Sequence, residues 1–167
     1  MKIIKKQYSF ISLLLIVIFV MASCSMETYA TKKNDANQEI FTYLIENKID
    51  ATPNPSGLVY IPVSDGVGES PELGDKVAFH YTGFYLNGEV FDSSYGKPYP
   101  LIVELGNGMI INGIEESLML MNKGAKAKVV IPFYLAYNDM ENAPVPPYSN
   151  LIFELELIDF TSVKKWN

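Results

Sequence analysis

Hydrophobic and polar residues alternate one by one in several segments of the chain. This period of two predicts β-strands, because successive side chains of a strand point to opposite faces of a sheet. The alternation covers residues 76–85, 125–131 and 151–158, and the short apolar segments 57–63 and 101–105 predict two further strands. The dipeptide Asn87-Gly88 predicts a tight turn, since both residues tolerate positive φ, and Gly83 interrupts the second strand as a bulge would. We therefore expect a mainly antiparallel sheet of five or six strands.

A helical spacing occurs between the strands expected at 101–105 and 125–131. Apolar residues recur there every three or four positions, with Glu115 and Glu116 opposite, and Lys123-Gly124 is typical of a helix end. The apolar positions are Ile110, Ile111, Ile114, Leu118 and Met121. The spacing predicts one helix of about three turns, which can cover only one face of the sheet. The fold class is therefore α+β, with a domain at residues 52–162, a C-terminal tail at 163–167 and room for an apolar site under the helix.

A second apolar stripe lies before this domain. Ile40, Leu44 and Ile49 fall at helical spacing within residues 35–49, and Pro53 and Pro55 follow. This short amphipathic helix either packs on its own domain or makes a weak dimer contact. We favour the first, because the segment is too short to sustain a coiled coil. Residues 25–37 are polar without periodicity and predict a tether, so residues 24–51 are assigned as tether and helix.

The first 23 residues have the pattern of a lipoprotein signal peptide. Three Lys residues precede an apolar run at 10–22, and small residues lead to Cys24. The sequence Met21-Ala22-Ser23-Cys24 resembles the bacterial lipobox, although Met is less usual than Leu at its first position. The alternatives are a secreted protein with a free thiol or an uncleaved membrane helix, for which the run is short. We expect a lipid on Cys24 and a place in the cell envelope, on the outer membrane facing the periplasm.

Composition excludes several other functions. The formal net charge is −6 and all thirteen basic side chains are Lys, so nucleic acid is not an expected partner. One His and one Cys make a zinc site or a disulfide framework improbable, and we expect no metal. No nucleophile elbow or phosphate loop occurs. What remains is an aromatic-rich domain, with an acid directly after Phe91, which suits an apolar ligand with few polar groups.

Four motifs in order are similar to those of the FKBP-type peptidyl-prolyl isomerases. They are Y-T-G with V-F-D-S-S within 77–94, L-G-N-G-M-I-I-N-G at 105–113, I-P-F-Y-L-A-Y at 131–137 and V-P-P-Y-S-N-L-I-F-E-L at 145–155. The resemblance covers residues 57–160. It implies a curved antiparallel sheet wrapped around one short helix. It also implies cis/trans isomerisation of the bond before proline in polypeptide substrates, without a cofactor, in support of folding of exported proteins.

The resemblance also implies site residues. Asp92 matches the family's buried acid near the substrate carbonyl, and the Ile111 N–H and Tyr137 hydroxyl match its hydrogen-bond donors, with Asp92 and Tyr137 as the catalytic pair. The substrate-binding positions are Tyr81, Phe91, Tyr99, Ile110, Ile111, Ile114, Val145 and Phe153. Each has a simpler interpretation, since strand aromatics are usually core and an Asp can cap a D-S-S turn.

Three positions depart from the family pattern. Ile114 stands where many members have a Trp at the pocket floor, and a smaller floor loses packing area against a proline ring. Asn138 replaces a Gly but tolerates the left-handed conformation. The loop at residues 140–147 is one residue shorter than in typical members of the family and is rich in proline. Two rival functions therefore stay open: a binding module without turnover, and a structural lipoprotein with an unused domain.

Overall fold

The computed structural model describes residues 28–162. The chain divides into two compact units, Met1–Asp35 and Ala36–Asn167, and the sheet belongs to the second. The predicted signal peptide at 1–23, the predicted lipidation site Cys24 and the predicted tail at 163–167 lie outside the described residues. No helix among the described residues is long and apolar enough to cross a bilayer.

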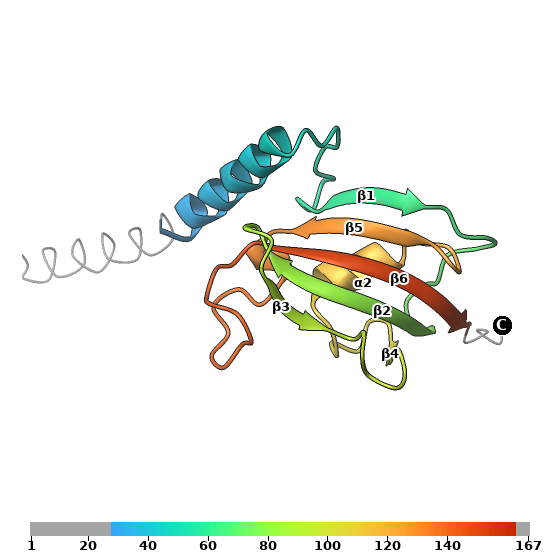
Figure 1. The fold of residues 1–167 in the computed structure, drawn as a ribbon. Helices are drawn as coiled ribbons and strands as arrows, with labels where there is room; N and C mark the ends of the chain where they lie inside the picture. Colours follow the sequence, from blue (N-terminus) through green and yellow to red (C-terminus); the bar gives the residue numbers. More distant parts are fainter. Residues whose placement is uncertain (1–27, 163–167) are drawn as a thin grey trace, which may run out of the picture. The chain divides into compact units, whose positions relative to one another are not determined.

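Six strands form one antiparallel sheet (Figure 1). Their order is β1-β5-β6-β2-β3, and β4 pairs with the part of β2 that β3 leaves uncovered. The bounds are β1 Val59–Ser64, β2 Lys76–Tyr85, β3 Val90–Ser93, β4 Leu101–Glu104, β5 Lys126–Ile131 and β6 Leu151–Thr161. The predicted α+β class and strand number are confirmed. The predicted bulge at Gly83 is present as a register shift between Gly83 and Phe84 in the β2–β3 pairing.

The helix α2, Asn112–Leu118, lies against one face of the sheet (Figure 1). Gly113 allows the close approach, because a Cβ there would lie 2.4 Å from Ile131 Cγ2 on β5. The prediction of about three turns is wrong. After Leu118 the chain tightens, with Met121 N–H bonding to the Leu118 carbonyl over three residues. Gly124, at φ 83°, belongs to the turn before β5 and not to the helix end.

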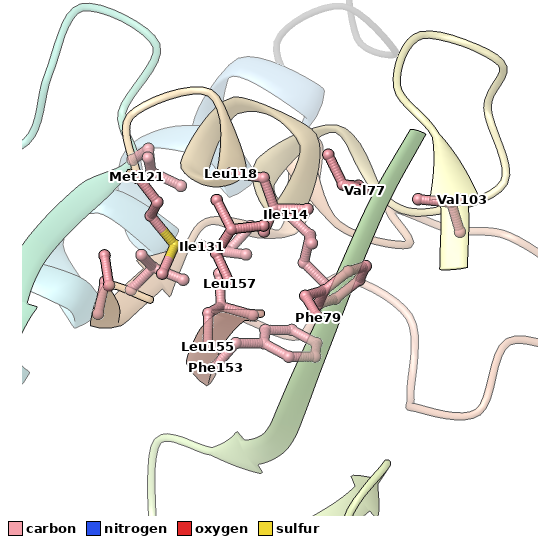
Figure 2. Packing of buried hydrophobic residues seen from close by; sticks show 14 of the residues in the cluster. Val77, Phe79, Val103, Ile114, Leu118, Met121, Ile131, Phe153, Leu155 and Leu157 are labelled. Carbon is pink, nitrogen blue, oxygen red and sulfur yellow. The ribbon is translucent and has the colours of Figure 1, made fainter. Parts of the chain in front are cut away.

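The main core fills the space between α2 and the sheet (Figure 2). Ile114 and Leu118 point from the helix toward the side chains of Ile131 and Leu157. Alternate residues of β5 and β6 enter this core, so its strands show the period of two that predicted them.

The opposite face of the sheet carries a second, smaller core. Its buried members are Ile40 and Leu44 from the N-terminal helix, and Val59, Val130 and Ile152 from the strands. Val130 and Ile152 each neighbour a residue of the main core in sequence, so they point to the other face. The helix of residues 36–46 thus packs on its own domain.

The N-terminal helix is also longer than predicted. Residues 28–46 are helical, whereas a polar tether was expected at 25–37 and a domain starting at residue 52. Lys, Ala, Gln and Glu are good helix formers, and extending an existing helix is easy once a packed turn has nucleated it. Absence of an apolar stripe therefore did not mean absence of a helix.

The neighbouring positions 44 and 45 provide a test of this packing. Leu44→Ala should lower the free energy of unfolding by about 2–4 kcal/mol, because it removes a buried side chain from the second core. Ile45→Ala removes a comparable side chain that is 61% exposed, and should change it by less than about 0.5 kcal/mol. Urea denaturation followed by circular dichroism measures both. Equal losses would contradict the assigned packing.

Candidate active site

A cavity of ≈ 500 Å³ opens between α2, the sheet and the loops that follow β4 and β5. Its wall is mostly apolar and aromatic, with a few polar groups. The lining residues are Phe79, Tyr81, Asp92, Leu101, Gly108, Met109, Ile110, Ile111, Asn112, Ile114, Ala136, Tyr137, Met140 and Phe153. Such a wall suits an apolar ligand oriented by a small number of hydrogen bonds.

Asp92 is held in the cavity by Tyr81. The Tyr81 hydroxyl on β2 donates a hydrogen bond of 2.6 Å to Asp92 Oδ2 on β3. The second carboxylate oxygen, Oδ1, accepts the Ser93 N–H at 2.8 Å. The two interpretations of Asp92 are therefore both met in one side chain: it caps the D-S-S turn and it faces the cavity.

Ser94 ties this turn to the strand beside it. Its side chain is buried, its hydroxyl accepts the Tyr81 N–H at 2.8 Å, and its own N–H donates to the Tyr81 carbonyl at 2.9 Å. His80 Nδ1 lies 3.0 Å from the same hydroxyl, and the His80 ring stacks on Tyr95. These contacts fix the backbone of Tyr81, and they give His80 a structural place outside the cavity lining.

The two expected donors lie at the cavity as well. Ile111 directly precedes α2, and no acceptor for its N–H is found among residues 28–162. The Tyr137 side chain lines the cavity. Burial raises the pKa of the Tyr137 hydroxyl, and the nearby negative charge of Asp92 raises this pKa further. The hydroxyl therefore stays protonated, and able to donate, at neutral pH.

Aromatic rings pack at one end of the cavity and directly behind it. Phe153 on β6 and Phe91 on β3 meet edge to face, with ring centroids 5.7 Å apart. Gly83 makes room for them, since a Cβ there would lie 2.6 Å from Phe91 Cζ and 2.9 Å from Phe153 Cε1. Ile114 on α2, at the position where a Trp is expected in many members, is buried and lines the cavity.

Three of the predicted substrate-binding residues do not line the cavity. Phe91 packs behind the wall, against Phe153 and Tyr85. Val145 is 6% exposed and belongs to the main core, where burial of its side chain is favourable. Tyr99 is 76% exposed, in a loop where prolines on both sides restrict the backbone. The other predicted positions do meet there.

Sequence reasoning missed several lining residues. Phe79 lies two residues before Tyr81 on the same strand face, so the period of two was a usable signal for it. Met109 and Met140 come from loops, and no local pattern pointed to them. No group of three or more His, Cys, Asp or Glu that could bind a metal ion occurs within the described residues.

A sequence profile of the family "FKBP-type peptidyl-prolyl cis-trans isomerase" matches residues 68–158. The chain belongs to this family. The fold is accordingly the FKBP-like α+β fold, with its six-stranded antiparallel sheet and short helix.

Several relatives of this FKBP-type chain agree with that assignment. It is 35% identical over 144 residues to FKBP-type peptidyl-prolyl cis-trans isomerase FkpA of Escherichia coli K12, covering 86% of this chain and 52% of the relative. It is 43% identical over 105 residues to peptidyl-prolyl cis-trans isomerase FPR2 of Saccharomyces cerevisiae, covering 61% of this chain and 76% of the relative. The crystal structure of FkpA from Escherichia coli superposes with a TM-score of 0.69 at 34% identity, covering 86% of this chain and 66% of that one. The chain spans about half the length of FkpA.

The two tyrosine hydroxyls of the cavity should ionise only at a pH above the usual value for tyrosine. Burial, followed by the hydrogen bond to Asp92, raises the pKa of the Tyr81 hydroxyl above its usual 10.0. A pKa that is raised on folding favours the folded state fully below pH about 10, and this contribution is lost as the pH rises through the higher folded value. The NMR signals of Tyr81 and Tyr137 are assigned by their absence from the spectra of Tyr81→Phe and Tyr137→Phe. In a pH titration of the ¹³C-tyrosine-labelled chain, these two signals should move only above pH about 10. Ionisation of either at or below the usual value would contradict the assigned environment.

Proposed function

We propose that this chain catalyses cis/trans isomerisation of the peptide bond before proline in polypeptide substrates, within the cavity beneath α2. One observation carries the proposal. In a chain of this family, an apolar cavity brings together an acid held by Tyr81, the Tyr137 hydroxyl and the Ile111 N–H.

The reaction requires rotation and no covalent intermediate. The barrier of about 18–20 kcal/mol arises from amide resonance, which is lost when the bond is twisted. A site accelerates the rotation if it binds the twisted amide better than the planar one. A dry, apolar cavity meets this requirement, because the twisted amide carries less charge separation than the planar amide and loses less on leaving water.

Each polar group has a distinct task in this proposal. The Ile111 N–H and Tyr137 hydroxyl donate to carbonyl groups of the peptide and fix its orientation. Asp92 lies beside the carbonyl of the rotating bond, where its fixed charge favours the altered dipole of the twisted state. The Tyr81 hydroxyl keeps the Asp92 carboxylate in place at 2.6 Å, so no reorganisation is needed during rotation.

Ile114 sets the strength of substrate binding. An aliphatic floor offers less area to the proline ring than an indole would, so weaker binding of proline analogues and macrolides follows. The rival function, binding without turnover, is favoured by Met109 and Met140, which line the cavity and are 66% and 61% exposed. Flexible methionine side chains adapt to varied apolar segments. The two functions differ in rate and not in architecture.

We further propose that the protein acts in the cell envelope as a lipoprotein that assists the folding of exported proteins. The leader supports this, with three Lys residues, an apolar run and Met21-Ala22-Ser23-Cys24. Lipid on Cys24 would hold the domain at a membrane, with the outer membrane facing the periplasm as the proposed location.

An isomerase assay on an X-Pro peptide, coupled to a protease, tests the enzymatic proposal. The wild-type chain should accelerate the slow phase, and Asp92→Ala and Tyr137→Phe should each lower kcat/KM by roughly tenfold, because each removes a group placed for the twisted amide. Glu89→Ala, an exposed acid in the β2–β3 hairpin, is the matched control and should have no effect. No acceleration by the wild type would contradict the enzyme proposal. An unchanged kcat/KM in both site variants would contradict the site assignment.

Metabolic labelling with a fatty-acid analogue tests the anchor. Cells producing the full chain should incorporate the label into this protein, and Cys24→Ala should abolish incorporation, since no other Cys is present. Ser25→Ala is the control and should remain labelled. Label retained in Cys24→Ala, or absent from the wild type, would contradict lipidation.

A further inference from the structure

The side chain of Asn150 joins the N-terminal helix to the segment that leads into the cavity wall. Asn150 is 5% exposed and directly precedes β6. Its Oδ1 accepts a hydrogen bond from the Phe133 N–H at 3.0 Å. Its Nδ2 donates to the Ala36 carbonyl at 3.2 Å and to Glu39 Oε2 at 2.6 Å. The buried Asn150 amide therefore binds the N-terminal helix with its nitrogen and the backbone of Phe133 with its oxygen.

The bond to Phe133 completes the start of the 3₁₀ helix η1, Phe133–Leu135. N–H groups at the start of a helix have no acceptor within it. Pro132, the residue before η1, makes no side-chain cap. Asn150 supplies the acceptor from 17 residues further along the chain, so the orientation of η1 depends on how this amide is held.

The η1 segment in turn places Tyr137. Ala136 and Tyr137 follow η1 directly and line the cavity. The Asn138 N–H donates to the Phe133 carbonyl at 2.9 Å, and the Asn138 carbonyl accepts the Tyr148 N–H at 2.7 Å. Tyr137 is thus enclosed in a short turn that begins at Phe133, so a shift of Phe133 displaces the Tyr137 hydroxyl.

A second contact joins the same two elements. The Tyr134 hydroxyl in η1 donates to Asn37 Oδ1 on the helix at 3.0 Å. Two independent hydrogen-bonded contacts, through Asn150 and through Tyr134, therefore hold η1 against the first turns of residues 36–46. The helix also has its own reason to stay there, because Ile40 and Leu44 are buried on the sheet.

We propose that Asn150 is a positioning residue for the isomerase site, and that the hydrogen bonds from Glu39 through Asn150 to Phe133 set the place of the Tyr137 hydroxyl. This inference rests on the proposed function. It makes residues 36–46, which lie outside the part that the family profile matches, a support of the active site.

Three variants of the full-length chain in detergent micelles test the connection, with kcat/KM for an X-Pro peptide as the measurement. Glu39→Ala removes an acceptor of Asn150 and should lower kcat/KM roughly fivefold. Glu39→Gln keeps an oxygen acceptor at that point and should retain most activity. Glu46→Ala removes an exposed carboxylate from the same helix and should have no effect. A Glu39→Ala chain with unchanged activity, or a Glu39→Gln chain as impaired as it, would overturn the proposal.

Combination with Tyr137→Phe shows whether the effect passes through the Tyr137 hydroxyl. Once this hydroxyl is absent, Glu39→Ala should cause no further loss. A full additional fivefold loss in the double variant would instead mean that the helix acts on the site by another route, and would overturn the assigned role. Asn150→Asp keeps the acceptor for Phe133 but cannot donate to Glu39, and it should reproduce the Glu39→Ala loss.

Hydrogen exchange separates this inference from the proposed function. The backbone N–H of Asn138, which donates to the Phe133 carbonyl, reports the order of the turn after η1 whether or not the chain is an enzyme. Its exchange should be faster in Glu39→Ala than in Glu46→Ala, and unchanged in Glu39→Gln. If the wild type lacks isomerase activity, the proposed function fails and this measurement alone decides the connection. Equal Asn138 exchange in all variants would overturn it.

Discussion

The pairing of β2 with β6 is the constraint on which the site depends. Its register places Tyr81 opposite Leu155 and Gly83 opposite Phe153. Because side chains alternate between faces, a slip of one residue would turn Tyr81 away from the cavity and separate its hydroxyl from Asp92. The register is secured from both faces, since Phe153 enters the main core and Ile152 lies in the second core with residues of the N-terminal helix.

Two glycines allow close packing around the cavity. Gly83 leaves the space in which the Phe91 and Phe153 rings meet, and Gly113 brings α2 close to Ile131. The second approach carries Ile114 to the cavity. A side chain at either glycine would have to displace a buried group in a closely packed core, so the shape of the cavity is fixed by backbone positions as much as by its lining residues.

The same burial governs the electrostatics. Low exposure raises the pKa of the Tyr81 and Tyr137 hydroxyls, and the charge of Asp92 acts on both in the same direction. Both phenols therefore remain donors over the whole physiological range. Asp92 accepts the Tyr81 hydroxyl and is oriented by the strand pairing together with the D-S-S turn, while its charge also acts on Tyr137. The polar groups of the cavity are therefore fixed by the fold before any ligand binds, which is the arrangement that electrostatic stabilisation requires.

The sequence by itself determined the fold class, the bounds of β2, the hairpin turn and the family motifs, and it showed that Asn138 tolerates the left-handed conformation that it adopts at φ 53°. Periodicity and turn chemistry are local, so they are legible without the fold. Only the tertiary structure decided that α2 ends at Leu118, that residues 28–37 are helical, and that Tyr99 is exposed while Val145 is buried. An apolar stripe marks the part of a helix that is buried, and it does not mark where the helix begins and ends. It is equally silent on partners such as Asn150 and Glu39, which lie 111 residues apart and meet only because the chain has folded.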